Sequence, residues 1–152
     1  MTFRWVLVGW KGKSLHVALI VMSLIVSVVA INDLCANWLM ERGFDQLQAA
    51  LYAPGEELLM KSLALDFAPR QTYYCLAIVQ IQLGKIAEAD QSLEKCMTAH
   101  LDASVYLTYA DLKLKQRKLE ESLASVEVLL ATHPSEDVER RARYIEAVIR
   151  IE

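Results

Sequence analysis

The feature that most constrains the fold of this 152-residue chain is a strongly apolar, uncharged run near its start. From Val17 to Ile31 the sequence is VALIVMSLIVSVVAI, in which Ser23 and Ser27 are the only polar residues. Extended to residues 14–33, the run reaches the length of about 20 residues that a helix needs to cross a bilayer. A helical serine can bond to a carbonyl one turn earlier, so both serines are tolerated in lipid. The sequence therefore predicts a transmembrane helix over this range.

The residues that flank this run agree with a membrane anchor. Trp5 and Trp10 precede it and Trp38 follows it, as in the aromatic belts at membrane–water interfaces. A cleaved secretory signal is the alternative, because Val28 and Ala30 suit the positions before a cleavage site. We favour an uncleaved anchor, since the charged region before the run is long and contains the apolar stretch FRWVLVGW.

The charges are distributed unequally about the run. Arg4, Lys11 and Lys13 precede it, whereas all 19 acidic residues lie at or after Asp33. In the fifteen residues after the run the only basic residue is Arg42, so the positive-inside rule keeps residues 1–13 in the cytoplasm and exports the rest. In a bacterium the C-terminal domain is then periplasmic and the anchor lies in the inner membrane. The formal net charge of −3 argues against a basic nucleic-acid binder.

Two segments in the second half of the chain can be superimposed at an offset of 33 residues. They are residues 70–101 and 103–134, and each has two stretches with apolar residues at helical spacing around a polar break. The break is Gly84-Lys85 in the first segment and Gln116-Arg117-Lys118 in the second. We expect Gly84 to adopt the left-handed conformation there, and Arg117 to make the same turn without a glycine. The matching residues are Tyr73 with Tyr106, Ala77 with Ala110, Ile81 with Leu114, Ile86 with Leu119, Leu93 with Val126, and His100 with His133.

These two units resemble the tetratricopeptide repeat (TPR). The first has Tyr73, Leu76, Ala77, Gly84 and Ala89 at motif positions, and the second has Tyr106, Tyr109, Ala110, Ser122 and Pro134. The first unit lacks the closing proline and the second lacks the turn glycine. The resemblance implies an all-α fold, a short helical solenoid behind the membrane helix, in which the paired helices cross closely at the small residues.

A degenerate unit is expected upstream, at residues 35–69. It would have a helix that continues almost directly from the membrane span, a break at Ala53-Pro54-Gly55, and a second helix that ends near Asp66. Pro54 suits a position in the first turn of that second helix. Together the three units occupy residues 35–134.

Residues 135–152 are expected to form a capping helix that Ser135 caps. Val138, Ala142, Ile145 and Ile149 would make its buried face, because a solenoid must close its last hydrophobic surface. Arg140, Arg141 and Arg143 fall mainly off that face. We interpret them as a solvated surface rather than a site for an acidic partner.

No catalytic, cofactor-binding or metal-binding motif is present in the sequence. His16, His100 and His133 are far apart, and the last two occupy equivalent repeat positions at the end of a helix, where an imidazole has a structural role. Cys75 and Cys96 fall on the two helices of one repeat. A disulfide between them is one interpretation, and we favour the other, two buried thiols; Cys35 stands apart. The chain is therefore expected not to be an enzyme and to bind no cofactor, metal, nucleic acid or small-molecule substrate.

The resemblance implies that the first helix of each pair lines a concave groove. On those helices the candidate partner-binding residues are Tyr74, Ile78, Ile81, Leu107, Asp111 and Leu114. TPR proteins that hold a terminal carboxylate use basic and amide residues at such positions, so the apolar Tyr74 and Ile78 argue against that chemistry. An apolar stripe one helical turn apart instead fits a partner helix or an apolar peptide. The alternative is that these residues are ordinary core or are covered by a neighbouring helix of the chain.

The function that we predict is a non-enzymatic, membrane-anchored scaffold that docks other membrane or periplasmic proteins of an envelope assembly or export machinery. The alternative is a permanent structural subunit of a larger membrane complex. A receptor that faces the cytosol, as in mitochondrial import, would call for basic residues just after the span, where this chain has acidic ones.

Overall fold

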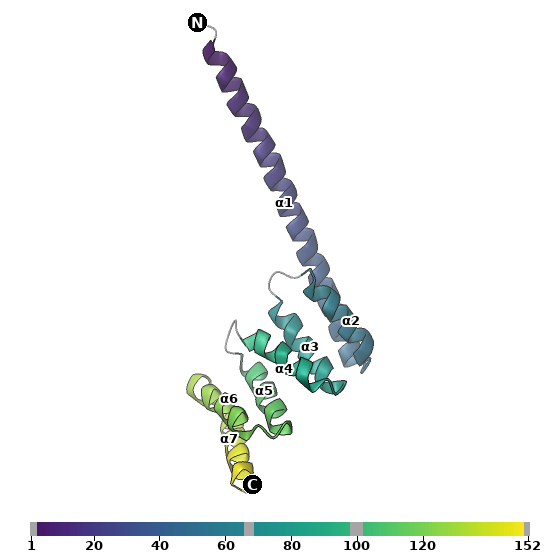
Figure 1. Ribbon diagram of the computed structural model, residues 1–152, viewed down its shortest axis with the longest axis vertical. Coiled ribbons are helices and arrows are strands. Elements are labelled where there is room, and N and C mark those ends of the chain that lie inside the picture. Colours follow the sequence, from purple (N-terminus) through teal and green to yellow (C-terminus); the bar gives the residue numbers. More distant parts are fainter. Residues whose placement is uncertain (1–2, 66–68, 98–101, 151–152) are drawn as a thin grey trace.

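The computed structural model describes residues 3–65, 69–97 and 102–150, which form helices and turns with no strand among them. The helices are α1 (Phe3–Gln48), α2 (Tyr52–Leu63), α3 (Arg70–Gln82), α4 (Ile86–Met97), α5 (Ala103–Lys115), α6 (Leu119–Thr132) and α7 (Glu136–Ile149). Helix α2 lies along the C-terminal end of α1, and α3 to α7 follow in a stack that leads away from it, while the N-terminal part of α1 extends in the other direction (Figure 1). The predicted all-α architecture is confirmed.

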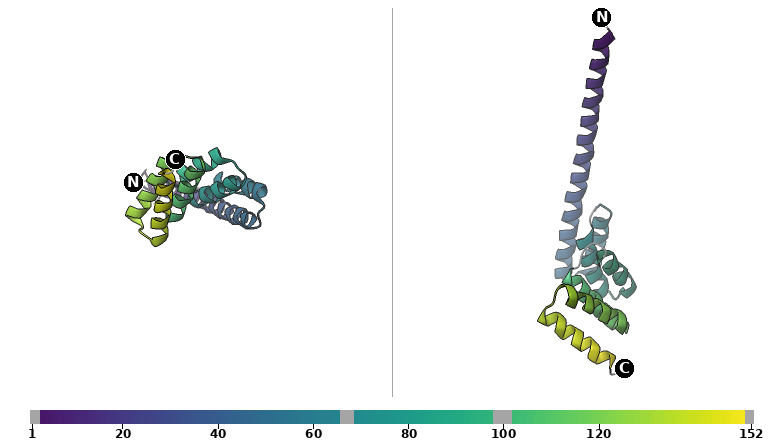
Figure 2. Two further views of the ribbon diagram at one scale, coloured as in Figure 1. Left: turned by 90° about the horizontal axis from the view of Figure 1, so that it is seen from below. Right: turned by 90° about the vertical axis from the view of Figure 1, so that its left-hand side faces the viewer.

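Helix α1 is a single uninterrupted helix of 46 residues. Its portion from His16 onward has a mean hydropathy of 2.4 over its most apolar window, none of which is buried by the rest of the chain. Large apolar side chains are exposed all along this portion, from Val17 at 61% to Leu34 at 69%. Among the described residues, this is the one helix that is long and apolar enough to cross a membrane. Figure 2 shows how far it projects beyond the other helices.

The C-terminal part of α1 pairs with α2, and two glycines set the distance between them. A Cβ atom on Gly43 would lie 2.7 Å from Leu59 Cγ and 3.3 Å from the Gly55 carbonyl oxygen. The turn between the helices falls at Ala49-Ala50-Leu51, where Ala50 has a φ of 57°. The break expected at residues 53–55 was therefore wrong, because these residues form the first turn of α2. A proline is tolerated there, since its missing N–H would have no intrahelical partner.

The two predicted repeats form the pairs α3–α4 and α5–α6. Ala77 and Ala89 are fully buried in the first pair, and Ala110 and Ser122 in the second, where the Ser122 hydroxyl donates to the Ala110 carbonyl oxygen at 2.7 Å. Both turns between the helices contain a residue with positive φ. These are Gly84 at 73° and, as expected without a glycine, Arg117 at 59°.

Each helix pair packs on its neighbour through one of three hydrophobic clusters. The first joins Leu59 of α2 to α3, and the second joins Ala77 and Leu93 to Leu112 of α5. The third joins Ala110 to Val126 and to the cap helix α7. Because each pair buries only its neighbour's face, the described core is continuous along the stack rather than central, as in a solenoid.

Helix α7 closes the stack as predicted. Its N-cap is Ser135, whose hydroxyl oxygen accepts a hydrogen bond from the Val138 N–H at 3.3 Å. Val138, Ala142 and Ile145 are buried against the third cluster. The side chain of Ile149, expected on the same face, lies outside the described residues.

Candidate functional site: a groove along the first helices

The repeat register extends the predicted groove positions from α3 and α5 to α1. Gly43, Ala77 and Ala110 occupy equivalent positions on α1, α3 and α5, at offsets of 34 and 33 residues. Three residues before them stand Met40, Tyr74 and Leu107, and one residue after them stand Phe44, Ile78 and Asp111. By this register the predicted groove would gain two apolar positions on α1, Met40 and Phe44. Phe44 is 41% exposed, which makes it the most accessible large apolar side chain of this set.

The three predicted residues on α3 are half-buried. Tyr74 and Ile81 pack partly against the second hydrophobic cluster, and Ile78 keeps part of its surface in solvent. The Tyr74 hydroxyl lies 3.4 Å from the Thr108 hydroxyl of α5. These side chains thus combine a structural contact with an accessible apolar surface.

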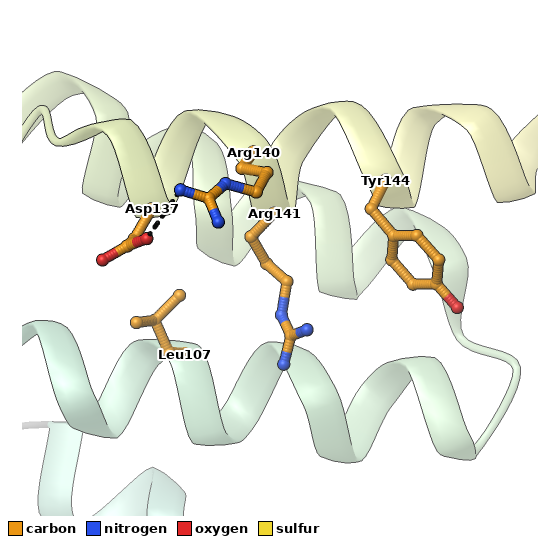
Figure 3. A pocket seen from close by; sticks show the side chains of 5 residues that line it. All are labelled: Leu107, Asp137, Arg140, Arg141 and Tyr144. Atoms are coloured by element: carbon orange, nitrogen blue, oxygen red, sulfur yellow. Dashed lines mark ion pairs between the residues drawn. The ribbon is translucent and has the colours of Figure 1, made fainter.

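The three predicted residues on α5 lie close to the cap helix. Leu107 lines a pocket of about 460 Å³ together with Asp137, Arg140, Arg141 and Tyr144 of α7 (Figure 3). Leu107 and Leu114 also pack partly against the third cluster. At this end, therefore, the predicted groove positions on α5 lie next to α7 and share a pocket with it.

Asp111 forms an ion pair with Arg141. In Figure 3 the Arg141 side chain extends from α7 toward α5. Arg141 is 39% exposed, against 71% for Arg140 and 78% for Arg143. The interpretation of the three arginines as a solvated surface thus agrees with two of them and was wrong for Arg141, whose partner lies 30 residues earlier in the chain.

The pocket is close to electrically balanced. Arg140 lies 3.2 Å from an Asp137 oxygen and 3.6 Å from a Glu136 oxygen, and Arg141 is held by Asp111. Because each guanidinium already has a carboxylate, this end of the groove does not present an unpaired positive charge to a partner.

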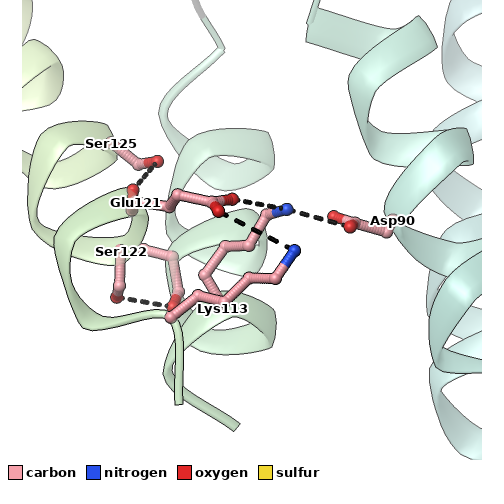
Figure 4. A network of polar contacts seen from close by, with 7 residues as sticks. Asp90, Lys113, Glu121, Ser122 and Ser125 are labelled. Carbon is pink, nitrogen blue, oxygen red and sulfur yellow. Dashed lines mark hydrogen bonds and ion pairs between the residues drawn. The ribbon is translucent and has the colours of Figure 1, made fainter. Parts of the chain in front are cut away.

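A buried lysine was missed by the sequence analysis. Lys113 of α5 is 2% exposed, and its ammonium lies 2.9 Å from Asp90 Oδ2 of α4 and 2.8 Å from Glu121 Oε2 of α6 (Figure 4). It also lies 4.6 Å from the ring centroid of Tyr109, at cation–π distance. Lys113 therefore connects the pair α3–α4 to the pair α5–α6 through charge as well as packing.

The network fixes the charge states of its members. Burial lowers the pKa of Lys113, but hydrogen bonds with Glu121, Asp90 and Tyr109 outweigh it and raise that pKa above its ordinary value. The hydrogen bond from Lys113 lowers the pKa of Glu121. The second oxygen of Asp90, Oδ1, is buried without a hydrogen-bond partner. Lys113 is therefore held in its charged form between the two helix pairs.

The structure has Cys75 and Cys96 as free, buried thiols and Cys35 as an exposed one. Burial raises the pKa of Cys75 and of Cys96. The Cys96 thiol donates a hydrogen bond to the Arg70 carbonyl oxygen at 3.3 Å. In the preceding pair, α1–α2, the Ser62 hydroxyl donates the equivalent hydrogen bond to the Ala36 carbonyl oxygen at 2.9 Å. Cys96 is thus a structural group.

Of the two histidines that were expected at helix ends, the structure describes His133. His133 stands at the C-cap of α6, as expected, whereas His100 lies outside the described residues. In the part of the chain that the structure describes, no group of three or more metal-ligating side chains comes together.

The fold resembles those of solved TPR structures. The Arabidopsis OM64 TPR domain superimposes with a TM-score of 0.70 at 15% identity, over 76% of this chain and 98% of that one. The first TPR of Spaghetti (RPAP3), bound to the HSP90 peptide SRMEEVD, superimposes with a TM-score of 0.71 at 18% identity, over 78% of this chain and 95% of that one. The Yersinia enterocolitica type III secretion chaperone SycD, in complex with a peptide of the translocator YopD, superimposes with a TM-score of 0.66 at 18% identity, over 76% of this chain and 94% of that one.

No protein-family model and no curated protein matches the sequence. The structural similarity covers about three quarters of the chain at low identity, so it establishes the fold and not the ligand. The chain is an all-helical protein with a TPR-like solenoid, preceded by a long apolar helix and closed by a capping helix.

Proposed function

We propose that this protein is a non-enzymatic, membrane-anchored scaffold whose TPR-like groove docks other proteins of a bacterial envelope assembly or export machinery. Residues 14–33 cross the inner membrane, residues 1–13 stay in the cytoplasm, and the solenoid is periplasmic. The uncovered apolar surface of α1 and the basic residues before it support this arrangement. Anchoring raises the local concentration of the groove near membrane partners.

One observation carries the docking proposal. The concave positions of α1 and α3 hold apolar side chains that remain accessible, with Phe44 41% exposed and Tyr74 and Ile78 half-buried. The RPAP3 and SycD structures hold peptides of partner proteins, which supports a peptide or helix as the ligand of this fold. An apolar stripe at this spacing fits one face of an amphipathic helix.

The test uses Phe44→Glu, because this side chain can be charged with little effect on the core. The matched control is Met60→Glu on α2, which is 58% exposed and does not stand at a groove position. Proteins crosslinked to the full chain in intact cells are compared by mass spectrometry, and helix content is measured in mild detergent. We expect Phe44→Glu to lose partners that Met60→Glu keeps, at equal helix content. Equal recovery by both variants would exclude the groove as the docking site.

A permanent structural subunit remains the second candidate. Leu34 and Trp38 are 69% and 57% exposed on α1, beyond the proposed span, and an apolar surface of this kind suits a fixed interface. Stoichiometric recovery of a constant set of membrane proteins, resistant to Phe44→Glu, would support it over exchangeable docking.

A further inference from the structure

Helix α1 gives the groove a fixed distance from the bilayer. The membrane span and the first helix of the solenoid are parts of one uninterrupted helix, Phe3–Gln48, with no turn between them. At a rise of about 1.5 Å per residue, Met40 and Phe44 stand about 10 Å and about 16 Å beyond Asp33, along a helix normal to the bilayer. The groove therefore starts next to the membrane surface and cannot move away on a flexible linker.

The C-terminal part of α1 is held rigidly by its contacts with the solenoid. Ala36 is 1% exposed, and its carbonyl oxygen accepts the Ser62 hydroxyl at 2.9 Å. Gly43 is packed against Leu59, and Met40 packs against the first hydrophobic cluster. Because these contacts begin only three residues after the span, no free hinge separates the bilayer from the groove.

The groove changes character along its length. Its members on α1 and α3, nearest the anchor, are apolar, whereas its far end at α7 is lined by paired charges and Tyr144. A ligand that suits this gradient has its apolar part close to the bilayer. Proteins that are themselves embedded in the membrane present apolar segments at that height.

We infer that the occupant of the groove is the apolar juxtamembrane segment of an integral membrane protein, held within about 25 Å of the bilayer surface by the length of α1. This inference rests on the proposed function. It goes beyond that proposal by naming the partner class and by giving α1 a second task, which is to set the height of the groove.

The experiment changes that height alone. An 18-residue helical insertion between Asp33 and Leu34 adds five whole turns, so it moves the groove about 27 Å outward without rotating it. The matched control places the same insertion between Lys13 and Ser14, on the other side of the membrane. A photoreactive p-benzoyl-phenylalanine at Phe44 reports the neighbour of the groove in intact cells.

We expect crosslinks to an integral membrane protein in the uninserted chain and in the control, and their loss in the Asp33–Leu34 insertion. Retention of the same crosslinks after that insertion would overturn the inference, and so would crosslinks to a soluble protein; both would leave the docking groove intact. Absence of crosslinks from the uninserted chain would instead contradict the proposed function itself. Helix content in detergent shows that each variant folds.

Discussion

Replacing Lys113 by methionine should destabilise the solenoid strongly. Methionine keeps most of the side-chain length but removes the charge that faces Asp90 at 2.9 Å and Glu121 at 2.8 Å. Lys113 is 2% exposed and Asp90 17%, so water reaches this pair poorly. Removal of one partner of a buried ion pair costs about 3–5 kcal/mol. We take the lower limit, about 3 kcal/mol, because Glu121 is 49% exposed and can turn to solvent.

The assay is thermal unfolding of the full chain in mild detergent, followed by circular dichroism at 222 nm. For a domain of this size, a loss of about 3 kcal/mol lowers Tm by roughly 10 °C. The control Lys115→Met changes an exposed lysine of the same helix and should shift Tm by no more than a degree or two. A Tm for Lys113→Met equal to that of this control would refute the reasoning.

A second substitution separates the charge from the packing. With Lys113→Met in place, Asp90→Leu removes the carboxylate that the first change left unpaired. Replacement of both partners of a buried ion pair by apolar residues often leaves the stability unchanged. The double variant should therefore recover much of the lost Tm, and a further fall would show that the methionine itself does not fit.

The pH dependence follows from the same contacts. The pKa of Glu121 is lowered from its ordinary value of 4.5, so its contribution to stability is present above that value and is lost as the pH falls through the folded-state pKa. The pKa of Lys113 is raised above 10.5, so its contribution is complete below that value and is lost only in strong alkali. Between pH 7 and acid pH, the free energy of unfolding should therefore fall by more in wild type than in Glu121→Gln, as measured by denaturant unfolding at each pH.

Two further outcomes test the packing. Gly43→Ala should lower the free energy of unfolding by about 1 kcal/mol. Overpacking of the new methyl group against Leu59 costs about 1–3 kcal/mol, and the better helix propensity of alanine offsets at most about 1 kcal/mol of that. A gain in Tm would contradict the close approach of α1 and α2. In detergent, maleimide should label the exposed Cys35 at once and Cys75 and Cys96 only after denaturation, as read by intact mass. Rapid triple labelling of the native chain would show that the pair α3–α4 is not packed as described.

The two regular repeats were predictable because their turns and small residues are marked in the sequence. The upstream pair was misplaced because Pro54 and Gly55 were interpreted as a break. In the structure Gly55 is instead a contact residue, opposite Gly43 and twelve residues after it. Ala77 and Ala89 have the same spacing. That spacing, rather than the proline, was the signal that would have placed the first turn at Ala50.

The burial of Lys113 was not predicted because its ion-pair partner on the other helix pair is distant in sequence and no local motif indicates it. Asp90 precedes it by 23 residues and belongs to the other helix pair. One indication did exist. Lys113 follows Ala110 by three residues, so both lie on the buried face of α5. A lysine at such a position must find a carboxylate on a neighbouring helix, because an unpaired buried charge is too costly. The identity of that carboxylate depends on how the pairs stack.

The end of the groove at α7 could have been found by carrying the repeat offset one step further. Adding 33 to Leu107 and Asp111 gives Arg140 and Tyr144, both of which line the pocket against α5. The capping helix thus stands where the first helix of a fourth pair would stand, and it presents groove residues as α1, α3 and α5 do. The interpretation of its arginines as solvent-facing treated α7 only as a lid for the core. By this register α7 would be the last wall of the proposed groove, so Arg140 and Tyr144 belong with Phe44 and Tyr74 in any mapping of the proposed docking surface.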